Sequence, residues 1–242
     1  MRLLQVGARY AEFASWLNQD SGNVRAATRW ADRAMEWAQE VGTHSWCLTC
    51  WSASLNRLRP CVTRRARSVL AQSALQHGRR LTSRGRAVAL QQLAVGYALA
   101  GDEVACQRAL DTAAQLAERS QQEQEEGPGR YCTLAYVEIQ RVATWIDLGR
   151  PERAINLFHD SLARLSSVHR RDRGVYLARL GSAYALSGSP DISVRKGWEA
   201  LTVAQATGSQ RIITELGQLR TRLAPWESTP QVGQLVKELH AA

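Results

Sequence analysis

The chain lacks the features that mark several common classes of protein. No apolar run approaches the roughly 18 residues that span a membrane, and Arg9 interrupts the apolar stretch 3–6 too early for a secretory leader. The five cysteines are an odd number in a long chain, which favours a reducing compartment over a disulfide framework. A phosphate-binding glycine loop, an HExxH motif and a nucleophile elbow are missing. We therefore expect a cytoplasmic, non-catalytic protein without a metal or other cofactor.

Acidic residues are absent between Glu40 and Asp102, and this segment contains nine arginines, as many as the whole net charge of +9. Such a patch attracts phosphate backbones or other anionic partners. The patch also fits a solvated surface in a chain whose cations are almost all arginine. Three interpretations of the patch therefore stay open: a solvated surface, a site for an anionic protein or ligand, and a site for nucleic acid. The predicted anionic-partner patch comprises Arg57, Arg59, Arg64, Arg65, Arg67, Arg79, Arg80, Arg84 and Arg86.

Small residues recur at three positions of a 39- to 40-residue repeat. Fourteen of the fifteen residues at these positions are Ala, Ser, Gly or Cys, although these types make up only 75 of the 242 residues. A repeat of this length indicates stacked helical hairpins, in which small residues let two helices cross closely. The three sets are Ser15, Ser54, Ala94, Val142 and Gly181; Ala27, Ala66, Cys106, Ala154 and Ser193; and Ala34, Ser73, Ala113, Ser161 and Ala200.

Each repeat is predicted to hold two helices joined by a tight turn, marked by Gly22, Gly101, Gly149 and Gly188, or by Pro60 in the second repeat. The predicted fold class is all-α, a right-handed α-solenoid of about six helical hairpins in a single domain over 1–242. The repeats are expected at about 4–41, 43–77, 82–120, 130–166 and 171–206, followed by a C-terminal capping hairpin at 209–242.

One step of the repeat is longer than the others. Gly101 and Gly149 are nine residues further apart than Gly149 and Gly188, and the Gln/Glu-rich stretch 121–129 has nine residues. We therefore expect an inserted loop at 121–129. The candidate helix N-caps are Asn23, Asp102, Ser189 and Thr229, the last two each followed by proline.

Two segments carry the small and large pattern of a known repeat. Leu93-Ala94 with Tyr97 and Gly101, and Leu180-Gly181 with Tyr184 and Gly188, resemble the tetratricopeptide repeat. The ordinary repeat of that family has 34 residues, so this version is divergent, and HEAT-like repeats of similar length are the competing architecture.

The N-terminal and C-terminal segments narrow this resemblance. Residues 9–13, Trp16, Trp30 and 32–36 resemble the first repeat after the DNA-binding domain in XRE-type helix-turn-helix regulators of high-GC bacteria, and 222–226 resembles their C-terminal capping hairpin. Met1 stands directly ahead of the first repeat, so we expect either the C-terminal portion of a longer regulator or a stand-alone relative without the DNA-binding domain. The resemblance implies a ligand- or protein-binding module, the sensory and dimerisation part of a regulator. The alternatives are a stand-alone scaffold that sequesters a small molecule, and nucleic-acid binding through the arginine patch.

Eight tryptophans against two phenylalanines suit a groove for a peptide, a protein segment or a hydrophobic small molecule. In tetratricopeptide arrays the concave side is lined by one face of each first helix. The candidate groove residues on that face are Trp16, Trp51, Gln91, Tyr136, Ile139 and Ser182. A metal role for His44, Cys47, Cys50 and Cys61 is weak, because structural zinc sites join separate knuckles. A homodimer is expected through an apolar face that the sequence does not identify.

Overall fold

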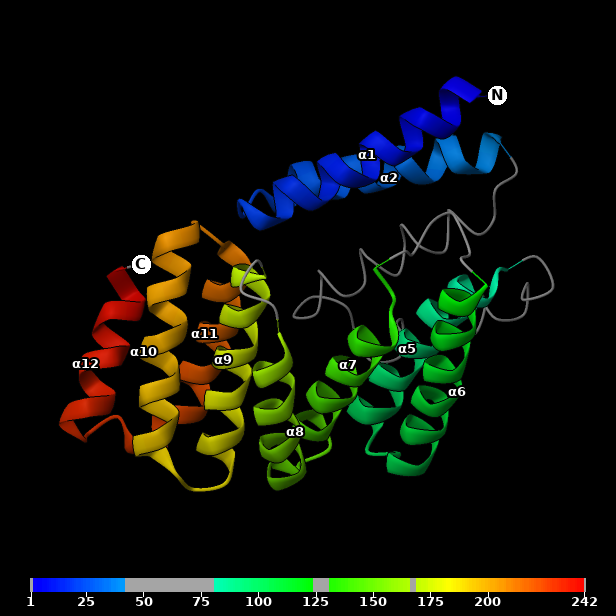
Figure 1. Cartoon of the computed structure of the whole chain (residues 1–242). Coiled ribbons are helices and arrows are strands. Elements are labelled where there is room, and N and C mark those ends of the chain that lie inside the picture. Colours follow the sequence, from blue (N-terminus) through cyan, green and yellow to red (C-terminus); the bar gives the residue numbers. More distant parts are fainter. Residues whose placement is uncertain (1, 42–80, 124–130, 166–168, 242) are drawn as a thin grey trace. The chain divides into compact units, whose positions relative to one another are not determined.

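The computed structural model describes residues 2–41, 81–123, 131–165 and 169–241 (Figure 1). Over these residues the chain is all-helical, with ten α-helices, one short 3-10 turn and no strand. Neighbouring helices pack in pairs, as in a helical-repeat solenoid, so the predicted fold class is confirmed. The right-handed sense of the solenoid stays a prediction, and the helices expected in the second repeat at 43–77 lie outside the described residues.

The chain divides into two compact units, Met1–Gln19 with Asn23–Leu148, and Asp20–Gly22 with Gly149–Ala242. The single domain expected over 1–242 stays a prediction. The first unit contains α1 (Arg2–Asp20) without its last residue and α2 (Val24–Glu40) as one hairpin, followed by α5 (Ser83–Ala100), α6 (Glu103–Gln122) and α7 (Leu134–Asp147). Helix α6 reaches Gln122, so the loop expected at 121–129 begins too early by two residues, and 124–130 lie outside the described residues.

The second unit contains α8 (Pro151–Arg164), α9 (Arg170–Leu186), α10 (Pro190–Thr207), α11 (Gln210–Leu223), the 3-10 turn Ala224–Trp226 and α12 (Pro230–Ala241). Helix α9 packs against α8, α10 and α11, and α12 packs against α10 and α11, as expected of a capping helix. Two ion pairs join α9 to α11: Arg179 to Glu215 at 2.6 Å, and Asp172 to Arg211 at 3.1 Å. In this unit Asp20 accepts a hydrogen bond from Ser209.

The four turn glycines have the left-handed backbone that the sequence predicts. Gly22, Gly101, Gly149 and Gly188 all have positive φ, between 70° and 81°. At Gly101, the backbone N–H of Asp102 donates to the carbonyl of Tyr97, which closes the helix end. Left-handed backbone is therefore the reason for glycine at these positions.

Two of the four predicted N-caps make the capping hydrogen bond: Asn23 and Asp102 each accept from a backbone N–H. Ser189 makes none. Thr229 instead donates its hydroxyl to the carbonyl of Trp226. Pro190 and Pro230 do begin their helices, as expected.

The small residues of the repeat lie where the two helices of a hairpin cross. Eleven of the twelve repeat positions within the described residues are buried, and Ser161 is half-buried. The Ser15 hydroxyl donates to the carbonyl of Ala27, and the Ser193 hydroxyl to that of Gly181, both at 2.8 Å. A Cβ at Gly181 would stand 3.2 Å from the Ser193 carbonyl oxygen, closer than ordinary contact. The crossing therefore excludes large side chains.

We expect Gly181→Leu to lower the free energy of unfolding by about 1–3 kcal/mol, because the added side chain must displace the α10 backbone. Gly217→Ala is the matched control. No atom lies within 4 Å of a Cβ added there, so it should raise the free energy by about 0.5–1 kcal/mol through helix propensity. Urea denaturation followed by circular dichroism measures both. Equal midpoints for the two variants would show that α9 and α10 do not cross closely.

Candidate functional site

The groove residues expected from the sequence fall in both units. In the first unit, Gln91 lies on α5 while Tyr136 and Ile139 lie on α7, and Gln91 and Ile139 occupy the same register of the repeat. Because α5 packs against α7, the structure brings these two helices together. Trp16 lies on α1 and Ser182 on α9 of the second unit, while Trp51 is outside the described residues.

Their burial differs. Gln91 and Ser182 are each 1% exposed, and Ile139 is also buried, whereas Trp16 and Tyr136 are half-buried. The ring of Tyr136 meets that of Tyr131 edge-on, with 5.2 Å between centroids. Tyr131 and Leu134 remain exposed, so the start of α7 presents an aromatic and apolar corner. Such a corner offers apolar and aromatic area to a ligand, and the groove itself stays a prediction.

Gln91 is the unusual member of the set. Its side-chain oxygen accepts a hydrogen bond from Gln92 at 3.0 Å, but its buried Nε2 has no acceptor among the described residues. A buried donor without an acceptor costs about 1–3 kcal/mol. Most buried polar side-chain atoms have a partner, so this amide marks a place where an acceptor would stabilise the structure.

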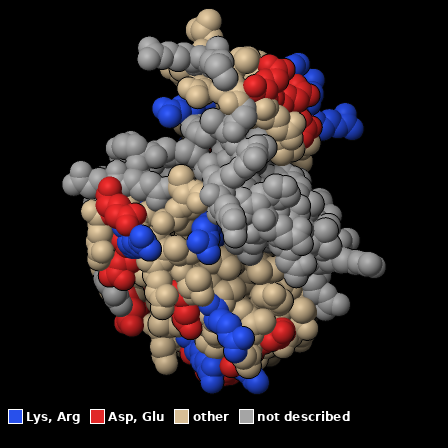
Figure 2. Space-filling view, turned by 90° about the vertical axis from the view of Figure 1, so that its right-hand side faces the viewer, with Lys and Arg blue, Asp and Glu red and all other residues tan. Residues whose placement is uncertain are grey.

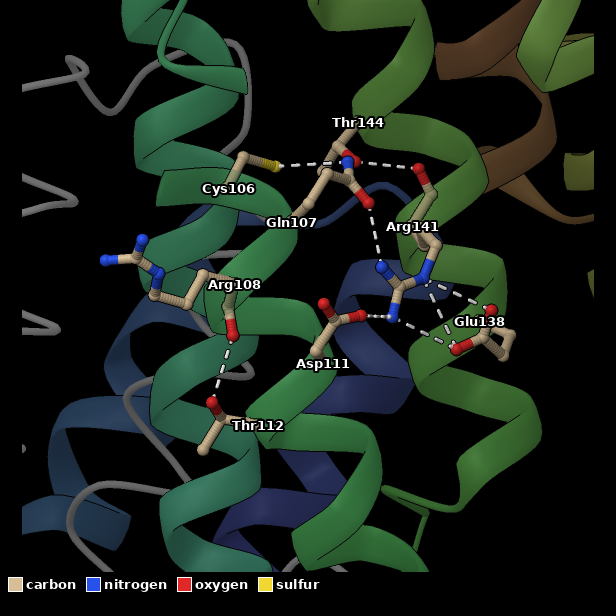
Figure 3. Close-up of polar contacts among 8 residues, drawn as sticks. All are labelled: Cys106, Gln107, Arg108, Asp111, Thr112, Glu138, Arg141 and Thr144. Atoms are coloured by element: carbon tan, nitrogen blue, oxygen red, sulfur yellow. Dashed lines mark hydrogen bonds and ion pairs between the residues drawn. The ribbon is translucent and has the colours of Figure 1, made fainter. Parts of the chain in front are cut away.

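A second polar cluster joins α6 to α7 and is centred on Arg141 (Figure 3). The Arg141 guanidinium contacts Asp111 of α6 at 2.9 Å, Glu138 of its own helix at 3.2 Å, and donates to the amide oxygen of Gln107 at 2.7 Å. Arg141 is largely buried and so engages three partners at once. The cluster ties two neighbouring repeats together, and a guanidinium so engaged is not offered to a ligand.

Sequence reasoning missed this cluster. The two partners of Arg141 on α6, Asp111 and Gln107, lie 30 and 34 residues earlier, and only the packing of α6 against α7 brings them together. The only local signal is the spacing of Glu138 and Arg141, which places both on one helix face. That spacing indicates an exposed intrahelical pair and says nothing of the contact to α6.

Two buried cysteines lie near these elements. Burial raises the pKa of Cys106 to about 11, and a side-chain hydrogen bond with Thr144 opposes part of this rise. Burial raises the pKa of Cys132 to about 12, against the lowering effect of Arg84. Cys106 fills a small-residue position at the crossing of α5 and α6, as the sequence predicts. Both thiols therefore belong to the packing.

Most of the arginine patch lies outside the described residues, and only Arg84 and Arg86 are described. Arg86 is exposed, but Arg84 is 8% exposed and its guanidinium donates to the hydroxyl and carbonyl oxygens of Ser120. On the face drawn in Figure 2 the described basic and acidic side chains are interspersed. An anionic partner for the patch stays a prediction.

Two further titratable side chains, His159 and Glu36, each have a polar partner. The imidazole Nε2 of His159 lies 2.8 Å from the hydroxyl of Tyr184, and Glu36 pairs with Arg33 of its own helix. Within the described ranges, no three His, Cys, Asp or Glu residues are grouped so that they could hold a metal ion. His44, Cys47, Cys50 and Cys61 lie outside those ranges.

No protein-family model matches the chain, and no curated protein matches it. The resemblance to tetratricopeptide repeats and to XRE-type regulators therefore stays a prediction from the sequence. No helix among the described residues combines the length and apolar character needed to cross a membrane.

We expect Cys106 and Cys132 to resist alkylation in the native protein, because the raised pKa of each removes the reactive thiolate. At mildly alkaline pH, iodoacetamide should modify their peptides about 100-fold more slowly than in denaturing urea. Mass spectrometry of each peptide measures the rates. Equal native and denatured rates at Cys106 would contradict its burial.

The same pKa shifts set the pH dependence of stability. The folded state favours the neutral thiols, so their contribution is complete below the ordinary thiol pKa and is lost as the pH rises toward about 11 for Cys106. Stability should therefore fall above pH 9, and Cys106→Ala should reduce that fall.

Proposed function

We propose that the chain is a non-catalytic helical-repeat module that binds a ligand or protein segment, and that it forms the sensory part of a cytoplasmic bacterial transcriptional regulator. The observation that supports ligand binding is the buried amide of Gln91, whose Nε2 has no acceptor among the described residues. It lies on the same register of the first helices as Ile139, and α7 also carries the aromatic pair of Tyr131 and Tyr136.

The chemistry of this face defines the ligand class. Ile139 and the two tyrosines favour an apolar or aromatic group, and the Gln91 amide favours a carbonyl or carboxylate oxygen. Gln91 is 1% exposed, so an acceptor that reaches it must leave water for the protein interior. A hydrogen bond is stronger in the interior than in water. A peptide segment or a hydrophobic metabolite with one carbonyl group fits this combination.

A ligand that contacts both α5 and α7 would connect neighbouring repeats. The curvature of a repeat array is set by small rotations between repeats, so a ligand that prefers one rotation would shift the array toward it. In a regulator, such a shift would change the spacing of attached DNA-binding domains. Small-angle scattering with and without a verified ligand measures this change.

We expect Gln91→Leu to separate stability from binding. The substitution removes a buried donor that has no acceptor, but it also removes the oxygen that accepts from the buried Gln92, so the two effects offset and the free energy of unfolding should change by no more than about 1 kcal/mol. Binding of a hit from a panel of short peptides and hydrophobic metabolites, followed by tryptophan fluorescence, should weaken by about tenfold or more. Nearly unchanged stability with weaker binding is not the pattern of a damaged fold.

Gln218→Leu is the matched control, because Gln218 is a half-buried glutamine on α11 of the other unit. It should leave binding unchanged. If Gln91→Leu binds the hit as tightly as the parent does, this face is not the site. If no compound in the panel binds the parent chain, the ligand-binding proposal fails.

A further inference from the structure

Helix α1 has two apolar faces of different kinds. Its small face consists of Ala8, Ala11 and Ser15, each 1% exposed. Ala11 packs with Ala34 and Trp37 of α2, and Ser15 donates to the carbonyl of Ala27. The small face of α1 therefore makes the contacts with α2, its partner in the hairpin.

The opposite face of α1 carries five large apolar residues spaced three and four apart in turn, which is the spacing of a coiled-coil seam. All five are exposed, and we name them the α1 stripe: Leu3 at 88%, Val6 at 48%, Tyr10 at 71%, Phe13 at 56% and Leu17 at 46%. The other exposed large apolar residues of the described segments are scattered, at most two to a helix.

The same register is covered in later repeats. Tyr10 corresponds to Ala89 of α5, Val137 of α7 and Tyr176 of α9, and each of these is at most 8% exposed. In α9 the ring of Tyr176 lies 6.5 Å from that of Phe158 on α8. In α9 the residue at this register is thus covered by the neighbouring helix α8. The residues of the α1 stripe are large and apolar, so burial against another helix would suit them as well.

The area of the α1 stripe is large enough for a specific interface. Five large side chains that are about half exposed or more offer roughly 600 Å² of apolar surface. This is at the upper end of the largest apolar patch of an ordinary monomer, about 300–600 Å². Two such stripes together offer about 1,200 Å², the lower bound of a standard specific interface.

We propose that the α1 stripe pairs antiparallel with the α1 stripe of a second copy of this chain. Antiparallel pairing places Tyr10 opposite Phe13 of the second copy and Val6 opposite its Leu17, so aromatic rings meet aromatic rings at the centre and aliphatic side chains meet at the ends. Each of these two residue pairs occurs twice, because the two copies are related by two-fold symmetry. One helix sequence therefore supplies both halves of the interface.

The residues beside the stripe suit this arrangement. Ala14 flanks one edge, and its small size lets the two backbones approach, whereas Gly7 faces Trp37 of α2. Arg9 and Trp16 flank the other edge, where antiparallel pairing brings Arg9 of one copy over Trp16 of the other, a favourable cation–π contact. The Trp16 ring is already oriented by stacking on Phe13, with centroids 5.9 Å apart. This dimer does not depend on ligand binding by Gln91.

Sedimentation equilibrium over a range of concentrations tests the proposal on the full chain. The parent should be a dimer, and Phe13→Glu should raise the dimer dissociation constant by about 30-fold or more, as loss of a central aromatic anchor does. The helical circular dichroism should not change. Val104→Glu is the matched control, because Val104 is 68% exposed on α6 and its substitution should leave the dimer intact.

The direction of pairing is tested by cysteine cross-linking. Oxidation of Val6→Cys mixed with Leu17→Cys should join residue 6 of one copy to residue 17 of the other, read by mass spectrometry of the linked peptides. Links between two residues 6 would overturn the antiparallel arrangement. A monomeric parent would overturn the dimer, and the α1 stripe would then be covered within its own chain. The dimer would also be overturned if Phe13→Glu and Phe13→Ser both lost helix while their oligomeric state stayed that of the parent.

Discussion

The close crossing of two helices at small residues is the constraint on which the rest of this structure depends. Two helix backbones approach closely only where neither side chain intervenes, and here a hydroxyl bonds directly to the opposing carbonyl. In α1 and α2 the first helix donates, from Ser15 to Ala27, whereas in α9 and α10 the second helix donates, from Ser193 to Gly181. The crossing therefore requires small size and not one residue type, which is why Ala, Ser, Gly and Cys alternate at these positions.

Because the crossing uses the small face of each helix, contacts between hairpins are left to other side chains. These contacts vary along the chain. Two ion pairs of opposite orientation fix the register of α9 against α11. Helix α9 supplies the cation in the pair of Arg179 with Glu215 and the anion in the pair of Asp172 with Arg211. Between α6 and α7, Arg141 alone engages three partners. Residues of α1 at the registers of Asp172 and Arg179 are Val6 and Phe13, so at these registers α1 replaces charge with apolar surface.

Features that depend on neighbours in sequence could be predicted. The turn glycines need only a left-handed backbone, and the helix bounds follow from them to within a few residues. Features that depend on distant partners could not. Arg84 suggests an exposed cation because its segment contains no acid, yet Ser120 binds its guanidinium from 36 residues away. Gln91 could be placed on the first-helix face, but its unused donor is visible only in the packed structure.

Helix α1 shows why apolar pattern alone does not choose the buried face. Burial of Leu3, Val6 and Tyr10 against α2 would remove more apolar area from water, at about 25 cal/mol per Å², than burial of Ala8 and Ala11 does. The small face turns inward all the same, where Ala8 and Ala11 let the two helices approach closely and Ser15 donates to Ala27. The larger hydrophobic gain is then unused within the hairpin. It becomes available to whichever surface meets the α1 stripe, and a surface of the same spacing and size exists on every copy of the chain.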